Sequence, residues 1–586
     1  MPRHPSPPRA LPRALPFQPA PWCVWLGAAT LAGALALPAQ AQVPPDAGRL
    51  LEQTRPPAQP TLPPASAPRV VDVPVRPTIS LPEGATVQAN GFRVTGATSY
   101  PTETLAALLQ PWQGKRLDIA GLNEAAGALT RYYQSRGHLL TYAYIPAQRV
   151  EGGVVEVAVL EGKLEAVQIV TAQEVRLRDE VIQAHTDRLA TQATQAEPPA
   201  PVLLPEVERQ MLLLNDIPGV AARAAFTPGS KTGGADMVVS VAEDEPLALR
   251  FELDNHGSRS TGETRAGAGL QLRDISGWGD QTSLRALVSS RGGLVSGSLG
   301  TLVPVGGDGF RIGASVSRLS YQLAGAFQAL GATGNANTVG AEVSYPFVRS
   351  ADTNLSVRVA GEHKRLRDEV QRIARSFPKR NTTLDVALSF DQRDTWVGQP
   401  GVWAARVTAS MGSLRLLDAE QRAADAAGLR TERQYRKVGM QFVRQQQLGG
   451  PYSVVLRAAG QASGGNLDSS EKFSLAGPGA VRSYAPGEAS VDQGALFSLE
   501  ARYAHDYLGG SFVWGLFHER GEGRINRLPV VAAGNEARLA GSGLSVQWNG
   551  ADIGLSASMA WRGSRVPTAE GGDPKPRIYL QMVVTP

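Results

Sequence analysis

Hydrophobic and polar residues follow two different periods along this chain, and the period changes once, close to residue 246. Between Ala85 and Ala242, strand-like and helix-like stretches alternate. From Leu247 onwards the helical period disappears, and segments of about ten residues with alternating character follow one another, separated by Gly, Asp, Asn and Pro. The pattern therefore predicts a mixed α/β region followed by an all-β region.

The α/β region repeats one order of elements. Its first copy has a strand (VQANGFRVTG), a helix (PTETLAALLQPW), a second helix (DIAGLNEAAGALTRYYQSRG) and two strands (LLTYAYIP, GVVEVAVLEG). In the second helix, Asp118 is the expected N-cap and Gly137 the expected C-cap, and the apolar positions Leu122, Ala125, Leu129, Tyr132 and Tyr133 follow helical spacing. The same order returns from LEAVQIV to ADMVVSVAE. Two small β-α-α-β-β domains are predicted, at residues 85–162 and 163–245.

The all-β region divides into sixteen segments, including TVGAEVSYPF, TLDVALSFDQ, FVWGLFHE and DIGLSASMAW. Every second connection is short, such as SGWGD, VGGDG, DYLGG and NGAD, and the others are mostly long. Outer-membrane barrels combine short periplasmic turns with long surface loops, whereas a β-sandwich or a propeller gives no reason for this alternation. Residues 246–586 are therefore predicted to form a 16-stranded antiparallel transmembrane β-barrel.

Three further segments precede these regions. A basic leader with Arg3, Arg9 and Arg13, an apolar stretch from Trp22 to Leu37, and Ala39-Gln40-Ala41 predict a signal peptide over residues 1–41. The alternative is a membrane-anchoring helix, but the apolar stretch is shorter than the ~20 residues that such a span needs. Residues 42–54 contain DAGRLLEQ (Asp46 to Gln53), typical of a short amphipathic helix, and the Pro-rich residues 55–84 are expected to be an extended linker without packed structure.

Composition excludes several classes of function. The single cysteine, Cys23, lies in the leader, so the mature chain is expected to have no disulfide, Cys-based metal site or thiol nucleophile. Without the three leader arginines, 55 Lys and Arg stand against 53 Asp and Glu, so the charge balance does not indicate nucleic-acid binding.

Motifs for catalysis are weak. PGSKTGG, at Pro228 to Gly234, resembles a phosphate-binding loop but has Ser before its Lys, so a hairpin turn is the better interpretation. The histidines are scattered, and Glu243-Asp244-Glu245 is expected to be a solvated run at a domain junction. We therefore expect no catalytic residue, no metal site and no cofactor.

Several motifs together resemble a known family. They are LNDIPGV (Leu214 to Val220), DNHGSRSTG (Asp254 to Gly262), VSYPFVRS (Val343 to Ser350) and EKFSLAGPGAVRSY (Glu471 to Tyr484). With the order of signal, short helix, linker, two small domains and barrel, the chain resembles the two-partner secretion transporters. These are hemolysin and hemagglutinin secretion proteins of the Omp85 superfamily, and their small periplasmic domains are POTRA domains.

The resemblance identifies candidate site residues. Val481-Arg482-Ser483-Tyr484 corresponds to the VRGY-type tetrad of the sixth surface loop, and Phe517, Glu519 and Gly521 to an F-x-D-x-G pattern on the thirteenth strand. In the family, the loop arginine folds into the barrel and pairs with that acid. Two residues depart from the pattern: Ser483 replaces Gly, and Glu519 replaces Asp. Ser would be strained if that position required a positive φ.

The resemblance also implies a function. The chain is expected to lie in the outer membrane of a Gram-negative bacterium and to export a large exoprotein of the adhesin or hemolysin type. The exoprotein's N-terminal secretion domain would dock on the POTRA-like domains, and the short helix would plug the barrel. Expected partners also include outer-membrane lipids and, during biogenesis, the barrel-assembly machinery, but no nucleic acid. Alternatives are an Omp85-type assembly factor, a diffusion porin and a barrel-embedded hydrolase.

Overall fold

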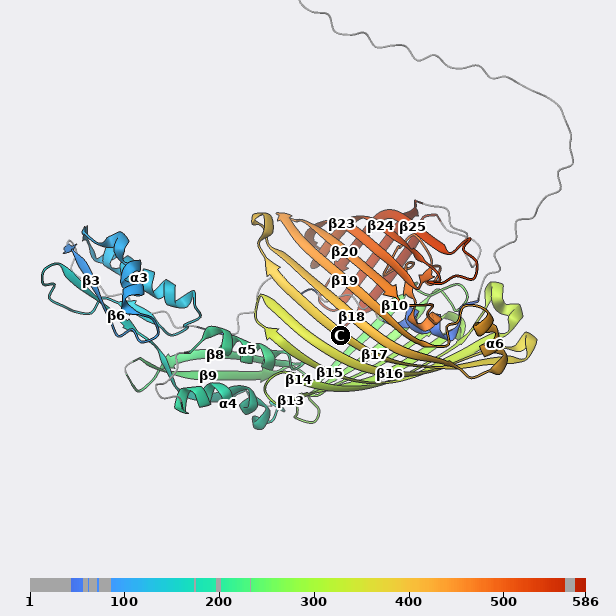
Figure 1. Cartoon of the computed structure of the whole chain (residues 1–586), viewed down its shortest axis with the longest axis horizontal. Helices are drawn as coiled ribbons and strands as arrows, with labels where there is room; N and C mark the ends of the chain where they lie inside the picture. The colour runs from blue at the N-terminus through green and yellow to red at the C-terminus, as the bar shows by residue number, and fades with distance from the viewer. Residues whose placement is uncertain are drawn as a thin grey trace, which may run out of the picture. The chain divides into compact units, whose positions relative to one another are not determined.

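The computed structural model describes residues 44–55, 62, 71–72, 86–172, 175–195, 202–231, 233–563 and 575–586. The predicted signal peptide and most of the predicted linker lie outside the described residues. Along the chain, a short helix α1 (Ala47–Thr54) is followed by two small α/β domains and a closed barrel (Figure 1). None of the helices in the described ranges is long and apolar enough to cross a membrane.

The first small domain packs two main helices on a three-stranded sheet of order β3-β6-β5, with a separate β2-β4 pair. Its elements are β2 (Val87–Ala89), β3 (Gly91–Thr95), α2 (Thr102–Leu108), η1 (Gln110–Trp112), β4 (Lys115–Leu117), α3 (Ile119–Gln134), β5 (Tyr142–Tyr144) and β6 (Val154–Leu160). Asp118 caps α3 as predicted, because its side chain accepts a hydrogen bond from Gly121 N. The C-cap is Ser135, and Gly137 follows with a φ of 87°.

The second small domain has β7 (Lys163–Thr171), α4 (Asp179–Gln195), α5 (Leu204–Asn215), β8 (Val220–Pro228) and β9 (Gly234–Glu243). Pro228 to Gly234 connects β8 and β9, which pair as an antiparallel hairpin, as the turn interpretation predicted. The expectation of a linker without packed structure is wrong at two points. One is Leu62, which packs against Ala404, Val443 and Val455 of the barrel. The other is a short strand. Residues 71–72 form β1 (Val71–Asp72), which pairs in parallel with Ala224 and Ala225 at the edge of this sheet. A pattern of two residues is too short to reveal a strand.

The barrel is closed and antiparallel, and it contains the sixteen strands predicted from the sequence. They are β10 (Leu247–Asp254), β11 (Arg265–Arg273), β12 (Gln281–Ser289), β13 (Leu294–Val305), β14 (Phe310–Gln322), β15 (Ala332–Arg349), β16 (Thr353–Val370), β17 (Arg375–Asp394), β18 (Gly401–Leu416), β19 (Gln434–Gly449), β20 (Tyr452–Ser463), β23 (Gln493–Tyr507), β24 (Gly510–Arg524), β25 (Glu536–Asn549), β26 (Ile553–Arg562) and β27 (Arg577–Val584). Pairing of β10 with β27 closes the barrel over four residue pairs.

The connections at the end of the barrel away from the small domains differ in length. Those that carry η2 (Ser290–Gly292) and η4 (Gln371–Ile373) are short, because the flanking strands extend far toward the turn, whereas those with η3 (Gly325–Leu330), α6 (Ala419–Ala427) and η6 (Ser469–Glu471) are longer. The turn with η5 (Trp396–Gly398) lies at the opposite end. Because the small domains join the barrel at the start of β10, the turns predicted to be short lie at the end of the barrel where that junction is.

Alternate residues of each strand face opposite sides of the wall. On β17, Lys379, Asn381 and Thr383 are buried inside, where the first two contact α1 or the loop after β20. Their neighbours Leu384, Val386 and Leu388 are exposed by 41–47% on the outer face. A polar interior and an apolar exterior are expected of a barrel embedded in lipid.

Candidate functional site inside the barrel

The connection between β20 and β23, residues 464–492, folds into the barrel and is called the inner loop below. It contains η6 and a small hairpin of β21 (Phe473–Ser474) and β22 (Ser490–Val491). Its apolar side chains form one buried cluster with the wall, comprising Leu475, Ala476, Val481, Tyr484, Ala489 and Val491 of the loop and Ala537 and Leu539 of β25. The inner loop is therefore packed as part of the protein core. As β20 is the eleventh barrel strand, this is the sixth connection at the end of the barrel away from the small domains.

Arg482 lies between two carboxylates of neighbouring strands. Its Nε donates to Glu519 Oε1 at 2.6 Å, and its backbone N–H donates to Glu519 Oε2 at 2.7 Å. Its Nη2 lies 3.3 Å from Oε2 of Glu500, on β23. The guanidinium carbon is 3.4 Å from the centroid of the Phe517 ring. Two charge-assisted contacts and a ring face thus stabilise a cation that has lost most of its water.

Glu500 did not emerge from the sequence analysis. It is 3% exposed and forms two more ion pairs. Arg502 Nε lies 3.1 Å from its Oε1, and Arg457 Nη1 lies 3.6 Å from its Oε2. Glu500 and Arg502 are two residues apart on one strand and therefore share a face. This pairing of an acid and a base was the only local feature of the sequence that could have indicated an interior ion pair. The sequence does not show that these side chains lie at the same depth as Arg482.

Ser483 occupies the position where the family usually has glycine. It is fully buried, and its φ is not positive, so the backbone strain considered for a serine at this position does not arise. The space for its side chain exists because the neighbouring wall residue, Gly541 of β25, has no side chain. A Cβ added at Gly541 would overlap with Ser483. The extra atoms of Ser483 therefore fill the gap beside a glycine of β25.

The last residue of the tetrad is fixed from two strands. Tyr579 of β27 donates its hydroxyl hydrogen bond to Tyr484 O at 2.8 Å. The guanidinium of Arg562 lies 4.3 Å from the Tyr484 ring centroid, and its Nε donates to Ser483 O at 2.9 Å. Neither Arg562 nor Tyr579 was a predicted site residue, because nothing local in the sequence connects either one with the inner loop.

Phe517, Glu519 and Gly521 are alternate residues of β24, the thirteenth strand, so all three share its interior face. Gly521 lies against the inner loop, where an added Cβ would be 3.2 Å from Val481 Cγ2. The spacing of the pattern thus places the ring of Phe517, the carboxylate of Glu519 and the position without a side chain at Gly521 next to one another beneath the tetrad.

The helix α1 also lies inside the barrel, next to a different part of the wall. Its buried residues Ala47, Leu50 and Leu51 pack with a cluster that includes Leu319, Tyr321 and Leu366. These wall residues belong to β14 and β16, whereas the tetrad contacts β23 to β27. The tetrad and α1 therefore rest on different strands, although Glu471 of the inner loop also reaches Lys364 of β16.

Polar contacts tie α1 to both the wall and the inner loop. Asp46 is its N-cap and accepts from Arg49 N, from Lys379 Nζ at 2.9 Å and from Ser469 Oγ at 2.6 Å. Lys379 Nζ also contacts Asp468 Oδ2 at 2.7 Å. One buried lysine of β17 is thus shared by the helix and the loop.

Two other matched motifs meet each other. Asp216 of LNDIPGV accepts two hydrogen bonds from Arg349 of VSYPFVRS, at 2.8 and 2.9 Å. Arg311 Nη2 donates to the backbone O of the same Asp216 at 2.8 Å. This bidentate pair fastens the end of α5 to a short turn of the barrel.

The interpretation of Glu243 as part of a solvated run is wrong. Its side chain is 1% exposed, and its Oε2 accepts from Arg176 N at 2.7 Å. Burial raises the pKa of Glu243 above its usual value, and the bond from Arg176 offsets only part of that rise. Within the described ranges, no group of three or more His, Cys, Asp and Glu side chains could hold a metal ion.

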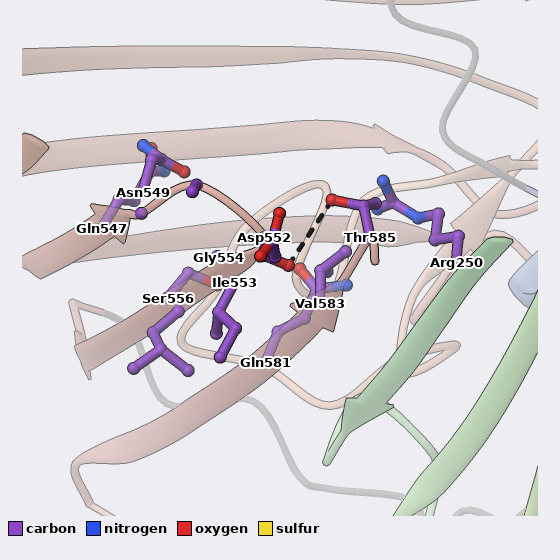
Figure 2. A pocket seen from close by; sticks show the side chains of 13 residues that line it. Arg250, Gln547, Asn549, Asp552, Ile553, Gly554, Ser556, Gln581, Val583 and Thr585 are labelled. Carbon is purple, nitrogen blue, oxygen red and sulfur yellow. Dashed lines mark hydrogen bonds between the residues drawn. The ribbon is translucent and has the colours of Figure 1, made fainter. Parts of the chain in front are cut away.

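A polar cavity of about 350 Å³ lies at the β25–β26 turn (Figure 2). Its lining comes from the ends of β10, β25, β26 and β27 and includes Arg250, Asn549, Gln581 and Thr585. Thr585 Oγ1 donates to Asp552 O at 3.5 Å (Figure 2). The cavity contains no residue of the inner loop or of α1, so it is separate from the site described above.

Comparison with known proteins agrees with this architecture. Residues 233–514 match the family of the haemolysin secretion/activation proteins ShlB/FhaC/HecB, and residues 87–162 match the POTRA domain of ShlB type. The heme/hemopexin transporter protein HuxB of Haemophilus influenzae (strain 86-028NP) is 25% identical over 425 residues, which are 72% of this chain and 73% of HuxB. The outer membrane transporter CdiB of Escherichia coli is 25% identical over 199 residues, 34% of this chain and 32% of CdiB.

A solved structure of CdiB from Escherichia coli has a TM-score of 0.65 with 18% identity, covering 89% of this chain and 94% of that one, and it shows the shared fold. The family matches include the first small domain and most of the barrel. The chain is therefore a two-partner secretion transporter similar to the ShlB/FhaC/HecB proteins, and it exports a large exoprotein across the bacterial outer membrane, with its POTRA domains in the periplasm.

Proposed function

We propose that the inner loop is a fixed element of the secretion pore and that α1 is its removable plug. The observation that carries this proposal is the placement of Arg482 between Glu519 and Glu500, with Phe517 beneath it. Val481, Arg482, Ser483 and Tyr484 then keep the inner loop against the wall while the exported chain passes. Phe517, Glu519 and Gly521 form the wall side of that anchor.

The exported partner is one large exoprotein of the adhesin or hemolysin type, which reaches the periplasm unfolded. The names of HuxB and CdiB support an exported cargo protein but do not give the activity of this partner. Its N-terminal secretion domain docks on the POTRA domains by adding a strand to an open sheet edge. The pairing of β1 with Ala224 and Ala225 supports this mode, since the edge of β8 already accepts an extended segment.

Export needs no cofactor and no enzymatic step in this proposal. The barrel-assembly machinery inserts the transporter, the bound exoprotein displaces α1, and the exported chain folds outside the cell. Folding at the surface prevents the chain from sliding back and so gives export its direction. The closely packed interior around Arg482 supports a pore that does not have to dismantle its loop.

The experiment compares the secreted and surface proteins of a deletion strain that is complemented with the wild-type chain or with a variant lacking residues 85–242. We expect the variant to insert into the outer membrane and to export nothing, whereas the wild-type chain restores one large protein. Near-normal export by the variant would contradict docking on the POTRA domains. General loss of outer-membrane barrels in the deletion strain would favour an assembly factor, and loss of small-molecule uptake alone would favour a porin.

A further inference from the structure

Three arginines lie side by side on the outer face of the barrel wall. Arg365 of β16 is directly opposite Arg380 of β17, and Arg380 is directly opposite Arg415 of β18. These strands are neighbours in the wall (Figure 1). Opposite residues of paired strands have Cβ atoms about 4.5–5.5 Å apart, so three like charges stand in a row across about 10 Å. We call Arg365, Arg380 and Arg415 the arginine row.

The arginine row faces outward. Each member follows or precedes a buried residue of the interior face: Lys364, which contacts Glu471, Lys379, which contacts Asp46, and Leu414. Because successive side chains of a strand point to opposite sides, the arginines point away from the barrel interior, and all three are exposed. A polypeptide passing through the interior could not reach them.

The row lies at the surface end of the lipid-facing band. β16 is the seventh strand, so it runs away from the end that bears the POTRA domains, and Arg365 is close to its far end. On β17, Leu384, Val386 and Leu388 form the exposed apolar band, and Arg380 precedes Leu384 by four residues. At about 3.3 Å per residue and a strand tilt near 40°, Arg380 lies roughly 10 Å above Leu384. This is the level of the lipid headgroups in the outer leaflet.

The row is not neutralised by the protein. Within the described part of the chain, no ion pair or side-chain hydrogen bond involves Arg365, Arg380 or Arg415. The nearby acids are engaged elsewhere, since Asp418 and Glu420 contact Arg375. Like charges directly opposite one another destabilise a sheet, so an unpaired row calls for an external counter-charge.

The other side of the barrel is built differently. On β24 and β25, Arg520 contacts Glu522 at 3.1 Å, and Arg538 contacts Glu536 at 2.8 Å. Glu522 is also directly opposite Arg538. Outward arginines on that side alternate with acids in one network, so their charge is balanced within the wall, unlike that of the arginine row.

We infer that the arginine row binds the phosphate groups of lipopolysaccharide in the outer leaflet. Phosphate suits the guanidinium fork, which donates two parallel hydrogen bonds to its oxygens. A headgroup that carries several phosphates matches a row of several charges, and a lipid anchored in the leaflet arrives at the right height. The bound lipid would fix the orientation and depth of β16 to β18 in the membrane. This inference rests on the outer-membrane location and not on the proposed secretion mechanism.

The test measures lipopolysaccharide binding to the full-length purified transporter in detergent, by displacement of a fluorescent lipopolysaccharide. The variant carries Arg365→Gln, Arg380→Gln and Arg415→Gln together, and the matched control carries Arg520→Gln and Arg538→Gln. We expect the triple variant to bind about a hundredfold more weakly, because each arginine near an anionic membrane surface contributes roughly a factor of five. The control is expected to bind like the wild type. Dephosphorylated lipopolysaccharide is expected to compete poorly.

Each other outcome overturns the inference. These outcomes are wild-type affinity of the triple variant, an equal loss in the control, equal competition by the dephosphorylated lipid, and equal competition by inorganic phosphate alone. Without lipid, the triple variant is expected to resist heat at least as well as the wild type, because the repulsion between like charges is removed. If the triple variant does not fold, Arg380→Gln, at the centre of the row, is measured alone and is expected to bind about fivefold more weakly.

Discussion

Two of the segments described inside the barrel, the inner loop and α1, are attached in contrasting ways. The inner loop is covalently continuous with two strands, has a buried apolar cluster of its own, and places Arg482 between two glutamates. The helix α1 has eight residues and three buried apolar side chains, and its polar contacts centre on Asp46 and the shared Lys379. A helix this short is not stable by itself in water, so its position depends on these contacts.

The difference indicates which segment moves. Removal of either segment would expose an apolar cluster. Removal of the inner loop would also leave Glu519 without a cation, whereas removal of α1 leaves Lys379 with its second partner, Asp468. In addition, α1 contributes only three apolar side chains to its cluster, so we expect its departure to be less costly than that of the loop. The predictions below test this contrast in order of expected effect.

The largest effect is expected from the anchor. Arg482→Ala leaves Glu519 buried without a positive partner, a situation that typically costs about 3–5 kcal/mol, and water that enters the cavity is expected to reduce this cost. Glu519→Ala is expected to be milder, because Arg482 keeps Glu500 at 3.3 Å. Both variants are expected to impair export strongly in a secretion assay while the barrel still resists heat and detergent.

A double-mutant cycle provides the control for this pair. The losses of Arg482→Ala and Glu519→Ala are expected to be non-additive, because each truncation removes a contact of the other residue. Glu519→Asp, which restores the usual family residue, is expected to retain most export. Additive defects, or wild-type export by Arg482→Ala, would show that the anchor is not needed.

The next effect concerns the space for Ser483. Gly541→Ala introduces a Cβ that overlaps with Ser483 and is expected to displace the tetrad, at a cost of about 1–3 kcal/mol. Ser483→Gly removes the overlapping side chain and is expected to restore most export in the Gly541→Ala background. Ser483→Gly alone serves as the control and is expected to export normally. Failure of this rescue would mean that the two residues do not share one space.

Much of the fold could be predicted because it depends on local periods. Sixteen strands and the elements of the small domains follow from alternation, helical spacing and turn residues within short windows. The expected alternation of long and short connections holds only in part, because β16 and β17 extend through residues that had been expected to form a loop. The short strand β1 could not be predicted, because two residues among prolines carry no period and their pairing partner lies about 150 residues away. Glu243 was misread for a related reason: charge runs are usually solvated, and only the packed structure brings Arg176 to it.

The candidate site could be predicted only in part. The motifs named Arg482 and Glu519 through resemblance, and the structure brings these two side chains together. Glu500 and Tyr579 were missed, because many interior positions carry polar residues and strand register decides which of them share a depth. The fit between Ser483 and Gly541 is likewise a property of two strands and not of either sequence segment.

Removal of Asp46 to Gln53 is expected to have a small effect on export and a large effect on the conductance of the pore. The deletion takes away a helix about 10 Å across, so single-channel conductance in planar bilayers is expected to rise while export stays close to normal. Unchanged conductance would show that α1 does not block the pore. A loss of export as large as that of Arg482→Ala would abolish the contrast between the two segments.

The smallest and most specific effect is expected from Gly48→Ala. Alanine favours the helix over glycine by about 1 kcal/mol, so α1 by itself becomes more stable. A Cβ at Gly48, however, overlaps with Ser469 and would lie 2.8 Å from Ser470 N of the inner loop, so the docked helix must shift. If docking of α1, and not formation of the helix, closes the pore, more frequent channel openings are expected in planar bilayers even though the helix itself is more stable.

Thr54→Ala, at the other end of α1, is the matched control and is expected to leave the frequency of openings unchanged. Fewer openings in Gly48→Ala would show that helix stability, rather than the contact with the inner loop, controls the plug.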